Sequence, residues 1–314
     1  MNIGKPLKSA AADNAVQDYH VPVLLSETLE GLNVKQNGVY VDCTLGGGGH
    51  TKALLKQLGD NGKLLVFDQD EDAKKNVPDD ERVIFIPQNF KHLQKFLRLH
   101  NYPLVDGIMA DLGVSSHQFD EAERGFSIRF DAPLDMRMDV RQPLKAADIL
   151  QTYSEHALHK MFEKYGEVTN AKTLAATIVA QRQNSTFTSI NQFKQALHSL
   201  VKGNPNKYFA QVFQALRIEA NDEMGALEIM LTQAVAVLKP AGRLAVITFH
   251  SVEDRLVKQL MKAGDMPTVA DDIFGHRPTL PMKLINKKPI TASQDELKIN
   301  PRSRSAKLRI AEKK

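Results

Sequence analysis

The chain lacks the features that mark secreted and membrane proteins. Its only cysteine among 314 residues is Cys43, which excludes an internal disulfide and fits a reducing cytoplasm. No segment approaches the roughly 18 uninterrupted apolar residues of a membrane span. Residues 1–18 also contain no apolar stretch of signal-peptide type. We therefore expect a cytoplasmic protein with no membrane partner, whose first 18 residues form a flexible polar arm.

The chain also has little net charge. A formal charge of +4, with 42% hydrophobic and 25% charged residues, describes a soluble globular protein that can meet an anionic partner without requiring one. The basic residues are concentrated near the C-terminus, at Lys283, Lys287, Lys288, Lys298, Arg302, Arg304, Lys307 and Arg309. Two interpretations stay open: a solvated, partly disordered terminus, or a phosphate-contacting edge of a nucleic-acid-binding protein.

Short apolar runs alternate with amphipathic segments in the first third of the chain. Strands are expected at 38–44, 63–68, 82–86 and 104–111, and again at 242–250 and 306–312; helices are expected at 50–59 and 89–100. This alternation predicts an α/β fold whose parallel sheet is covered on both faces.

The alternation of apolar and amphipathic segments ends after the fourth expected strand. Residues 112–142 have no sustained period and predict a long functional loop, and residues 143–238 follow helical spacing throughout. We expect an all-helical insertion domain at 141–221 that covers the carboxyl ends of the strands. The sheet domain would then be discontinuous, formed by 19–140 and 222–314. A helix from Ser251, with that residue as N-cap, is expected after the fifth strand.

Four consecutive glycines stand at the first strand-to-helix turn, in "VDCTLGGGGHTKALL" (41–55). A phosphate-binding P-loop needs Gly-Lys-Ser/Thr, but His50 and Thr51 follow Gly49. A strict dinucleotide fingerprint also fails, because Thr51 or Lys52 occupies its last glycine position. S-adenosylmethionine, which has no phosphate, remains. Asp68, about 20 residues further on, could accept its ribose hydroxyls or could simply cap the next helix.

Two aspartates and the cysteine lie near the expected strand ends. Asp42 could face the positive end of the cofactor or pin the loop amides, and both interpretations stay open. Cys43 is expected as a small buried filler, which argues against covalent attack on a pyrimidine. Asp111 ends the fourth strand, where it could accept a proton from an exocyclic base amine, or cap the loop in which Ser115 and Ser116 supply turn hydroxyls.

Seven segments occur in the order of a known family. They are "HVPVLLSETLEGL" (20–32), "VDCTLGGGGHT" (41–51), "DGIMADLGVSSHQFDEAERGFS" (106–127), "PLDMRMD" (133–139), "FQALRIEAND" (213–222), "GRLAVITFHSVEDRLVK" (242–258) and "NPRSRSAKLRIAE" (300–312). Together the sequence resembles the bacterial 16S ribosomal RNA cytosine-N4 methyltransferases of the MraW type, from about residue 20 to 312.

The resemblance implies a class I S-adenosylmethionine-dependent fold with a helical insertion. It also implies N4-methylation of a cytidine at the decoding centre of 16S rRNA in the small (30S) subunit, with no metal and no covalent enzyme intermediate. A homodimer is an open alternative. The implied cofactor contacts are Gly48, Gly49, His50, Asp68, Phe90, Asp111 and Gln118. The implied catalytic residues are Asp111, Ser115, Ser116 and His250. The implied substrate contacts are Arg124, Phe126, Asp135, Arg137 and Ser251.

A flipped cytosine would need a flat partner, which Arg124 and Phe126 could offer. The sequence departs from the family pattern in two places. "YFAQV" (208–212) replaces the usual Arg-Thr pair before "FQALR", and His117 stands where proline is common. Two rival functions remain: an oxidoreductase with a degenerate nicotinamide-nucleotide loop, and a non-catalytic ribosome-assembly factor that keeps the cofactor pocket as a relic.

Overall fold

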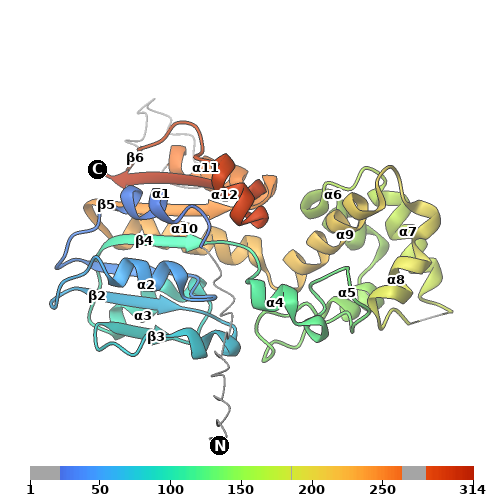
Figure 1. The fold of residues 1–314 in the computed structure, drawn as a ribbon. Coiled ribbons are helices and arrows are strands. Elements are labelled where there is room, and N and C mark those ends of the chain that lie inside the picture. The colour runs from blue at the N-terminus through green and yellow to red at the C-terminus, as the bar shows by residue number, and fades with distance from the viewer. Residues whose placement is uncertain (1–21, 185, 264–280) are drawn as a thin grey trace, which may run out of the picture.

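A seven-stranded sheet forms the centre of the larger part of the molecule (Figure 1). The computed structural model describes residues 22–184, 186–263 and 281–314, so the arm expected at 1–18 lies outside the described residues. The strands are β1 (Val39–Asp42), β2 (Lys63–Phe67), β3 (Val83–Ile86), β4 (Val105–Asp111), β5 (Leu238–Thr248), β6 (Met282–Leu284) and β7 (Lys307–Lys313). Their order is β3-β2-β1-β4-β5-β7-β6. Strands β1 to β5 pair in parallel, and β7 runs antiparallel to both β5 and β6.

Helices cover both faces of this sheet, which explains why its strands are apolar on both sides. On one face, α3 (Leu93–Leu99), α10 (Glu223–Val237) and α11 (Ser251–Ala263) pack in one apolar core. On the other face, α1 (Leu25–Leu32) and α2 (Gly49–Leu55) pack in a second core. A parallel sheet with this order and an antiparallel seventh strand is the class I methyltransferase fold, so the predicted fold class is confirmed.

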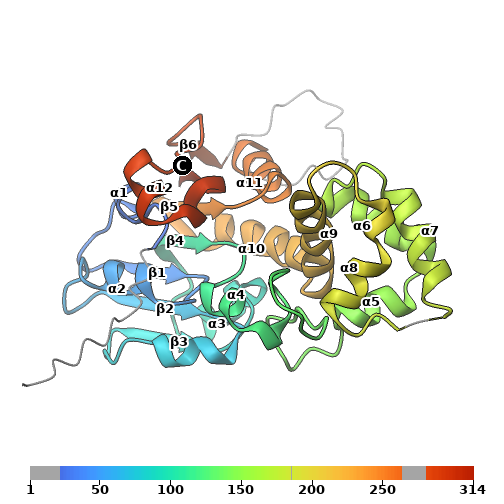
Figure 2. The ribbon, with the colours of Figure 1, turned by 45° about the vertical axis from the view of Figure 1, so that its right-hand side comes forward.

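A helical part with its own apolar core follows β4. It contains α5 (Ala146–Thr152), α6 (Glu155–Gly166), α7 (Ala171–Gln181), α8 (Ile190–Ala196) and α9 (Pro205–Ala220). Figures 1 and 2 show these helices beyond the arrowheads of the parallel strands, with α9 leading back to α10. In the altered segment before "FQALR", Tyr208, Phe209 and Val212 are buried, so these residues pack the helical core. The domain boundaries at 141 and 221 stay a prediction.

Some local expectations need correction. The C-terminal segment is not a disordered tail: it forms β6, α12 (Gln294–Ile299), the 3₁₀ turn η5 (Pro301–Ser305) and β7. Ser251 is the first residue of α11 and not its N-cap, because the carbonyl of the preceding His250 accepts the first helical hydrogen bond, from the Asp254 amide at 3.1 Å. Across the described ranges, no helix combines the length and the apolar character that crossing a bilayer requires.

Candidate cofactor and substrate site

Three aspartates meet at the carboxyl edge of the sheet. Asp42 ends β1, Asp111 ends β4, and Asp68 directly follows β2. Because the sheet order places β2, β1 and β4 side by side, the chain ends of all three strands open onto one edge. Ligands of open α/β sheets bind at such an edge, so these strand ends are where a cofactor and a substrate are expected to meet.

Asp42 organises the glycine loop from inside. Its side chain is fully buried and accepts hydrogen bonds from the Thr51 hydroxyl at 2.5 Å and the Thr44 amide at 3.0 Å. Burial raises the pKa of Asp42, although these hydrogen bonds oppose the shift. The two interpretations left open by the sequence are thereby separated, because Asp42 is committed to holding the loop.

The four glycines divide into two pairs with different surroundings. An added Cβ at Gly49 would overlap Pro22, and one at Gly48, where φ is +76°, would stand 2.8 Å from the Asn76 carbonyl oxygen. An added Cβ at Gly47 would meet no atom within 4 Å, and at Gly46 the nearest is Ser115 Cβ at 3.8 Å. Protein packing therefore accounts for Gly48 and Gly49, the two glycines predicted to bind the cofactor. The open side belongs to Gly46 and Gly47, which were not among the predicted cofactor contacts.

Asp68 faces the same loop from the end of β2. One carboxylate oxygen accepts from the Gly46 amide and the other from the Asp70 amide, both at 2.9 Å. Burial raises the pKa of Asp68 to about 6, although the two amide hydrogen bonds oppose the shift. A carboxylate has about four acceptor sites, so roughly two remain for hydroxyl donors.

Asp111 carries a buried oxygen without a partner. Its Oδ2 lies 3.6 Å from His50 Nδ1, while Oδ1 has no hydrogen-bond partner in the part of the chain that the structure describes. Burial and the nearby Asp42 and Glu253 charges raise the pKa of Asp111 to about 6, against the influence of His50. An unpaired buried acceptor is costly unless a ligand satisfies it, so this atom indicates a binding position.

His50 lies beside Asp111 in the site. The ring is buried, and its Nε2 lies 3.0 Å from the Val23 carbonyl oxygen, to which it can only donate. That hydrogen bond turns Nδ1 toward the Asp111 carboxylate. The Asp111 amide donates to the Thr44 hydroxyl at 2.7 Å, which ties Asp111 to the segment that leads into the glycine loop.

The loop after β4 begins with a capping box. In α4 (Ser116–Asp120), the Ser115 hydroxyl accepts from the Gln118 amide at 3.2 Å, and the Gln118 side chain accepts from the Ser115 amide at 3.0 Å. Gln118 is buried and also donates to Asp70 at 2.7 Å, which ties α4 to the loop after β2. Ser115 and Gln118 therefore have structural partners, and the adjacent Ser116 is half-buried.

Arg124 connects the two halves of the site. Its guanidinium pairs with Asp70 at 2.9 Å and with Asp72 at 2.8 Å, and it donates to the carbonyls of Arg137 and Met138 at 3.1 Å each. The adjacent Phe126 is buried in the helical core, 5.9 Å from the Arg124 guanidinium carbon. Neither residue presents a free flat face, so this geometry does not support the base-stacking surface predicted for them.

Asp135 and Arg137 pair with each other in the "PLDMRMD" loop. The Arg137 guanidinium donates to both oxygens of Asp135 at 2.7 and 2.8 Å. Burial opposes ionisation of Asp135, but the hydrogen bonds from Arg137 outweigh it and hold the pKa of Asp135 below its usual value. These two predicted substrate contacts thus fold the loop in this structure.

His250 and Ser251 lie at the end of β5, beside the helical part. Both nitrogens of the His250 ring face Glu253: Nδ1 accepts from its amide at 3.3 Å, whereas the buried Nε2 lies 3.1 Å from its Oε1 but forms no hydrogen bond within the described residues. The fully buried Glu253 also accepts from the Phe249 amide at 2.8 Å. Ser251 donates to Glu167 at 2.9 Å. Glu253 and Glu167 were not predicted, although "SVED" within the family segment placed Glu253 two residues from Ser251.

The predicted cofactor residue Phe90 opens η2 (Phe90–His92), after β3. Its ring is half-buried against the core that contains α3 and α10. Asn89 precedes it as N-cap, accepting from the Lys91 amide at 2.8 Å and donating to Gln69 at 2.7 Å. The ring therefore stays close to the carboxyl edge, because the chain is pinned directly before it.

Several basic residues of the C-terminal segment are paired with acids of the same chain. Arg309 is buried and binds Asp254 at 2.6 Å, Lys307 lies 3.6 Å from the same carboxylate, and Arg302 binds Asp120 at 2.8 Å. Charges already paired in the fold are poor phosphate contacts, because each pair must be broken first. Of the two interpretations left open by the sequence, the phosphate-contacting edge is weakened by these pairs, and the disordered terminus is wrong.

S-adenosylmethionine fits the residues at this edge. Gly46 and Gly47 leave the loop open on the side where a Cβ would project, Asp68 keeps acceptor capacity for ribose hydroxyls, and Asp111 holds a buried oxygen without a partner. Both carboxylates are ionised at neutral pH with a pKa of about 6, which suits a cation and hydroxyl donors.

Comparison with known proteins points the same way. The model of the MraW methylase family matches residues 17–314. The chain is 52% identical over 298 residues to "Ribosomal RNA small subunit methyltransferase H" of Bacteroides thetaiotaomicron, which covers 94% of this chain and 98% of that protein. The protein of the same name from Flavobacterium johnsoniae is 50% identical over 297 residues, with 94% and 98% covered. A solved rRNA methylase from Streptococcus thermophilus aligns with 13% identity over 92% of this chain and 93% of that one, at a TM-score of only 0.37. The fold assignment therefore rests on the strand order.

Proposed function

Because the chain belongs to the MraW methylase family, whose members use S-adenosylmethionine, we propose that it methylates N4 of a cytidine at the decoding centre of 16S rRNA in the small (30S) ribosomal subunit. The observation that carries the proposal is the Asp111 carboxylate, which ends β4 with a buried oxygen that has no partner in the described residues. Such an acceptor suits an amine N–H donor. The proposal places the protein in the cytoplasm, in keeping with its single buried cysteine.

The residues at the carboxyl edge divide the binding task. Gly46 and Gly47 would let the backbone lie against the cofactor, and Asp68 would accept its ribose hydroxyls. His50, Phe90 and Gln118 would shape the remaining walls. When bound, S-adenosylmethionine supplies an electrophilic methyl group on a positively charged sulfur. Asp111, whose amide donates to the Thr44 hydroxyl and whose carboxylate lies beside the His50 ring, would face that group.

Asp111 is suited to the proton that the amine must lose. The lone pair of an exocyclic amine is delocalised into the base, and an acceptor on its N–H favours attack through nitrogen. With a pKa of about 6, the Asp111 carboxylate is mostly ionised at neutral pH yet basic enough to take that proton. We assign Asp111 to this step and treat orientation of the base as the other main contribution.

We also propose that the helical part, 141–221, recognises the RNA around the target. It stands beyond the carboxyl edge, where a base must arrive (Figure 2). Polar contacts contribute to its attachment to the sheet domain: Glu167 binds Ser251 and Arg255 at 2.9 and 2.7 Å, and Arg124, in the loop that leads to the helical part, binds Asp70. Ser116 and His250 remain catalytic candidates, and Asp135, Arg137 and Ser251 remain substrate candidates that would act through the loop positions they hold.

Labelled methyl transfer tests the proposal. We would incubate the protein with isotope-labelled S-adenosylmethionine and either unmodified small subunits or naked 16S rRNA, and analyse the nucleosides by mass spectrometry. Label in N4-methylcytidine establishes cofactor, substrate class and target atom together. Cofactor binding without label in any nucleoside would contradict the proposal and favour the assembly-factor alternative. Asp111→Asn, which keeps the size of the side chain, is the matched inactive control.

A further inference from the structure

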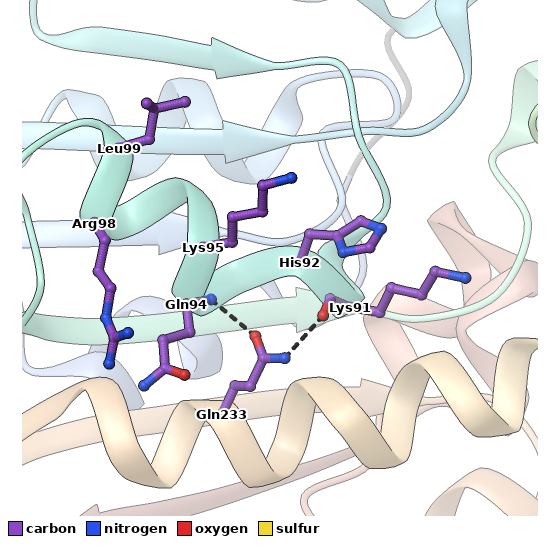
Figure 3. A pocket seen from close by; sticks show the side chains of 7 residues that line it. All are labelled: Lys91, His92, Gln94, Lys95, Arg98, Leu99 and Gln233. Atoms are coloured by element: carbon purple, nitrogen blue, oxygen red, sulfur yellow. Dashed lines mark hydrogen bonds between the residues drawn. The ribbon is translucent and has the colours of Figure 1, made fainter.

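A basic hollow of about 580 Å³ lies outside the site described above, between α3 and α10 (Figure 3). Its polar lining comes from η2, α3 and one residue of α10: Lys91, His92, Gln94, Lys95, Arg98 and Gln233. The face of α3 turned away from it carries Leu93 and Leu97, which are fully buried against the sheet. The hollow is thus a surface of a packed helix and not a gap in the core.

Gln233 gives the hollow a fixed floor. Its side-chain oxygen accepts from the Gln94 amide at 2.8 Å, and its side-chain nitrogen donates to the Lys91 carbonyl at 2.9 Å (Figure 3). The two hydrogen bonds join α10 to η2 and to the first turn of α3. The backbone that bears the basic side chains is therefore held in place before any ligand arrives.

The positive charges here have no acidic partner. Within the described part of the chain, no ion pair or side-chain hydrogen bond involves the Lys91 or Lys95 ammonium or the Arg98 guanidinium. Lys95 has only a ring contact, 5.7 Å from the centre of the Phe96 ring. Partial burial and the neighbouring Lys91 and Lys95 charges lower the pKa of His92, so this ring stays neutral at pH 7. Glu228, also on α10, lines a neighbouring hollow and not this one.

The hollow extends from the carboxyl edge of the sheet. Lys91 directly follows Phe90, the residue expected to contact the cofactor. In Figure 3, Lys91 and His92 lie on the side of the strand arrowheads, and Arg98 and Leu99 lie toward the other end of the strands. Seven helical residues span about 10 Å, enough for contacts with more than one phosphate group. An RNA strand that leaves the catalytic edge along α3 would meet Lys91 first and Arg98 last.

We propose that this hollow binds phosphodiester groups of the RNA substrate next to the target nucleotide. The inference rests on the proposed function and adds a second contact surface, on the face of the sheet domain. Unpaired lysine and arginine side chains in a row bind phosphates without reading sequence, so this surface contributes affinity and register. In the C-terminal segment, acids of the chain already pair with Arg302, Lys307 and Arg309, so these three side chains are less available to phosphates.

The test compares two double variants with the same spacing and the same loss of charge. Lys91→Ala/Lys95→Ala removes two positive charges from the hollow, and Lys52→Ala/Lys56→Ala removes two exposed ones from α2 on the opposite face of the sheet. Binding of unmodified small subunits, without turnover, is measured at several salt concentrations. For the hollow variant we expect about tenfold weaker binding and a salt slope smaller by about 1.4, from about 0.7 per phosphate lost. The control should match wild type, and cofactor affinity should be unchanged in both.

Three outcomes separate the alternatives. Equal affinity and salt slope in the hollow variant and the control overturn the inference, even if wild type still methylates RNA. In that case, inorganic phosphate that raises the melting temperature of wild type but not of the variant would identify a free-anion site. Lysine-dependent subunit binding by a protein that transfers no methyl group would uphold the inference and contradict the proposed function.

Discussion

Two groups of aspartates, one at the strand ends and one in the loop that leads to the helical part, have opposite surroundings. Asp68 and Asp111, at the strand ends, have no lysine or arginine partner among the described residues, and burial raises the pKa of each to about 6. Asp135 and Asp139, in the loop that leads to the helical part, are each bound by an arginine, Arg137 or Arg141, at 2.7 Å. Burial opposes their ionisation, but the arginines hold the pKa of both below the usual value.

The difference separates residues that bind a ligand from residues that hold the fold. A carboxylate whose acceptor sites are filled by a guanidinium fork has a partner in every state of the enzyme. A carboxylate left with unused acceptor sites is costly in the free protein, and a ligand can compensate for that cost. By this criterion the aspartates at the strand ends are the ones that bind ligand. The arginine-bound aspartates, together with the Arg124–Asp70 pair, hold the loop that attaches the helical part.

The comparison is tested most strongly by Asp111→Asn. We expect kcat to fall by about 10³-fold, because the amide cannot accept the amine proton. Stability should not fall, since the change removes a buried charge that has no cation partner. Single-turnover methyl transfer and a thermal melt of the same preparation measure both quantities. A variant with near-normal rate would contradict the assignment of Asp111.

The opposite result is expected for Arg124→Ala. The substitution leaves the buried Asp70 without its cation, which we expect to cost about 3 kcal/mol of stability. The free energy of unfolding from denaturant titration measures the loss. Arg129→Ala is the matched control, because the Arg129 side chain is exposed and makes no hydrogen bond or ion pair in the described residues; only its amide donates, to the Ser127 hydroxyl. If both variants unfolded like wild type, the Arg124 pairs would not be what fastens the loop.

The sequence was sufficient for the sheet and for the charged ends of its strands. Apolar runs of four to seven residues marked β1 to β4, and polarity placed Asp42, Asp68 and Asp111 at their ends, because parallel strands buried on both faces show as uninterrupted apolar segments. β6 has three residues, too few for any period to appear. The extent of β5, from Leu238, was hidden by Pro240 and Gly242, which are typical of a turn.

The details of the site depended on contacts between distant residues. Gly48 and Gly49 need their small size because of Asn76 and Pro22, which lie 28 and 27 residues away in the chain. Arginine is a residue type that often contacts phosphates or bases, but the Arg124 guanidinium is paired with Asp70 and Asp72. Local patterns report which residue types are present at a loop. They do not show which charged side chains are already paired within the fold.

Mild acid distinguishes the two aspartate groups without mutation. Lowering the pH from 7 to 5 protonates groups with a pKa of about 6, and leaves ionised those whose pKa lies below its usual value near 4. If Asp68 must be ionised to accept ribose hydroxyls, the Kd for S-adenosylmethionine should rise about tenfold over this interval. Calorimetric titration at several pH values measures it, and Asp68→Asn should bind weakly at every pH.

Lowering the pH is expected to have opposite effects on the stability of the free protein and on its affinity for the cofactor. Because the folded pKa of Asp68 and Asp111 lies above the unfolded value, the native state binds more protons between about pH 4 and 6. Their protonation therefore stabilises the free protein as the pH falls through that window. Asp135 and Asp139, with lowered pKa, lose their contribution only below about pH 4. Unfolding of the free protein at pH 5 before cofactor affinity is affected would contradict this separation.

The smallest effect is expected where an acid is paired but exposed. Glu167 binds Arg255 at 2.7 Å and the Ser251 hydroxyl at 2.9 Å, joining the helical part to α11, yet both charged side chains are about half exposed or more. Exposed ion pairs contribute about 0–1 kcal/mol and are screened by salt, so Glu167→Gln should lower the melting temperature by about a degree at low salt and less at high salt. Melts at two salt concentrations measure the difference. A loss as large as that of Arg124→Ala would mean that position between the two parts, and not burial, decides how strongly a charge pair holds them together.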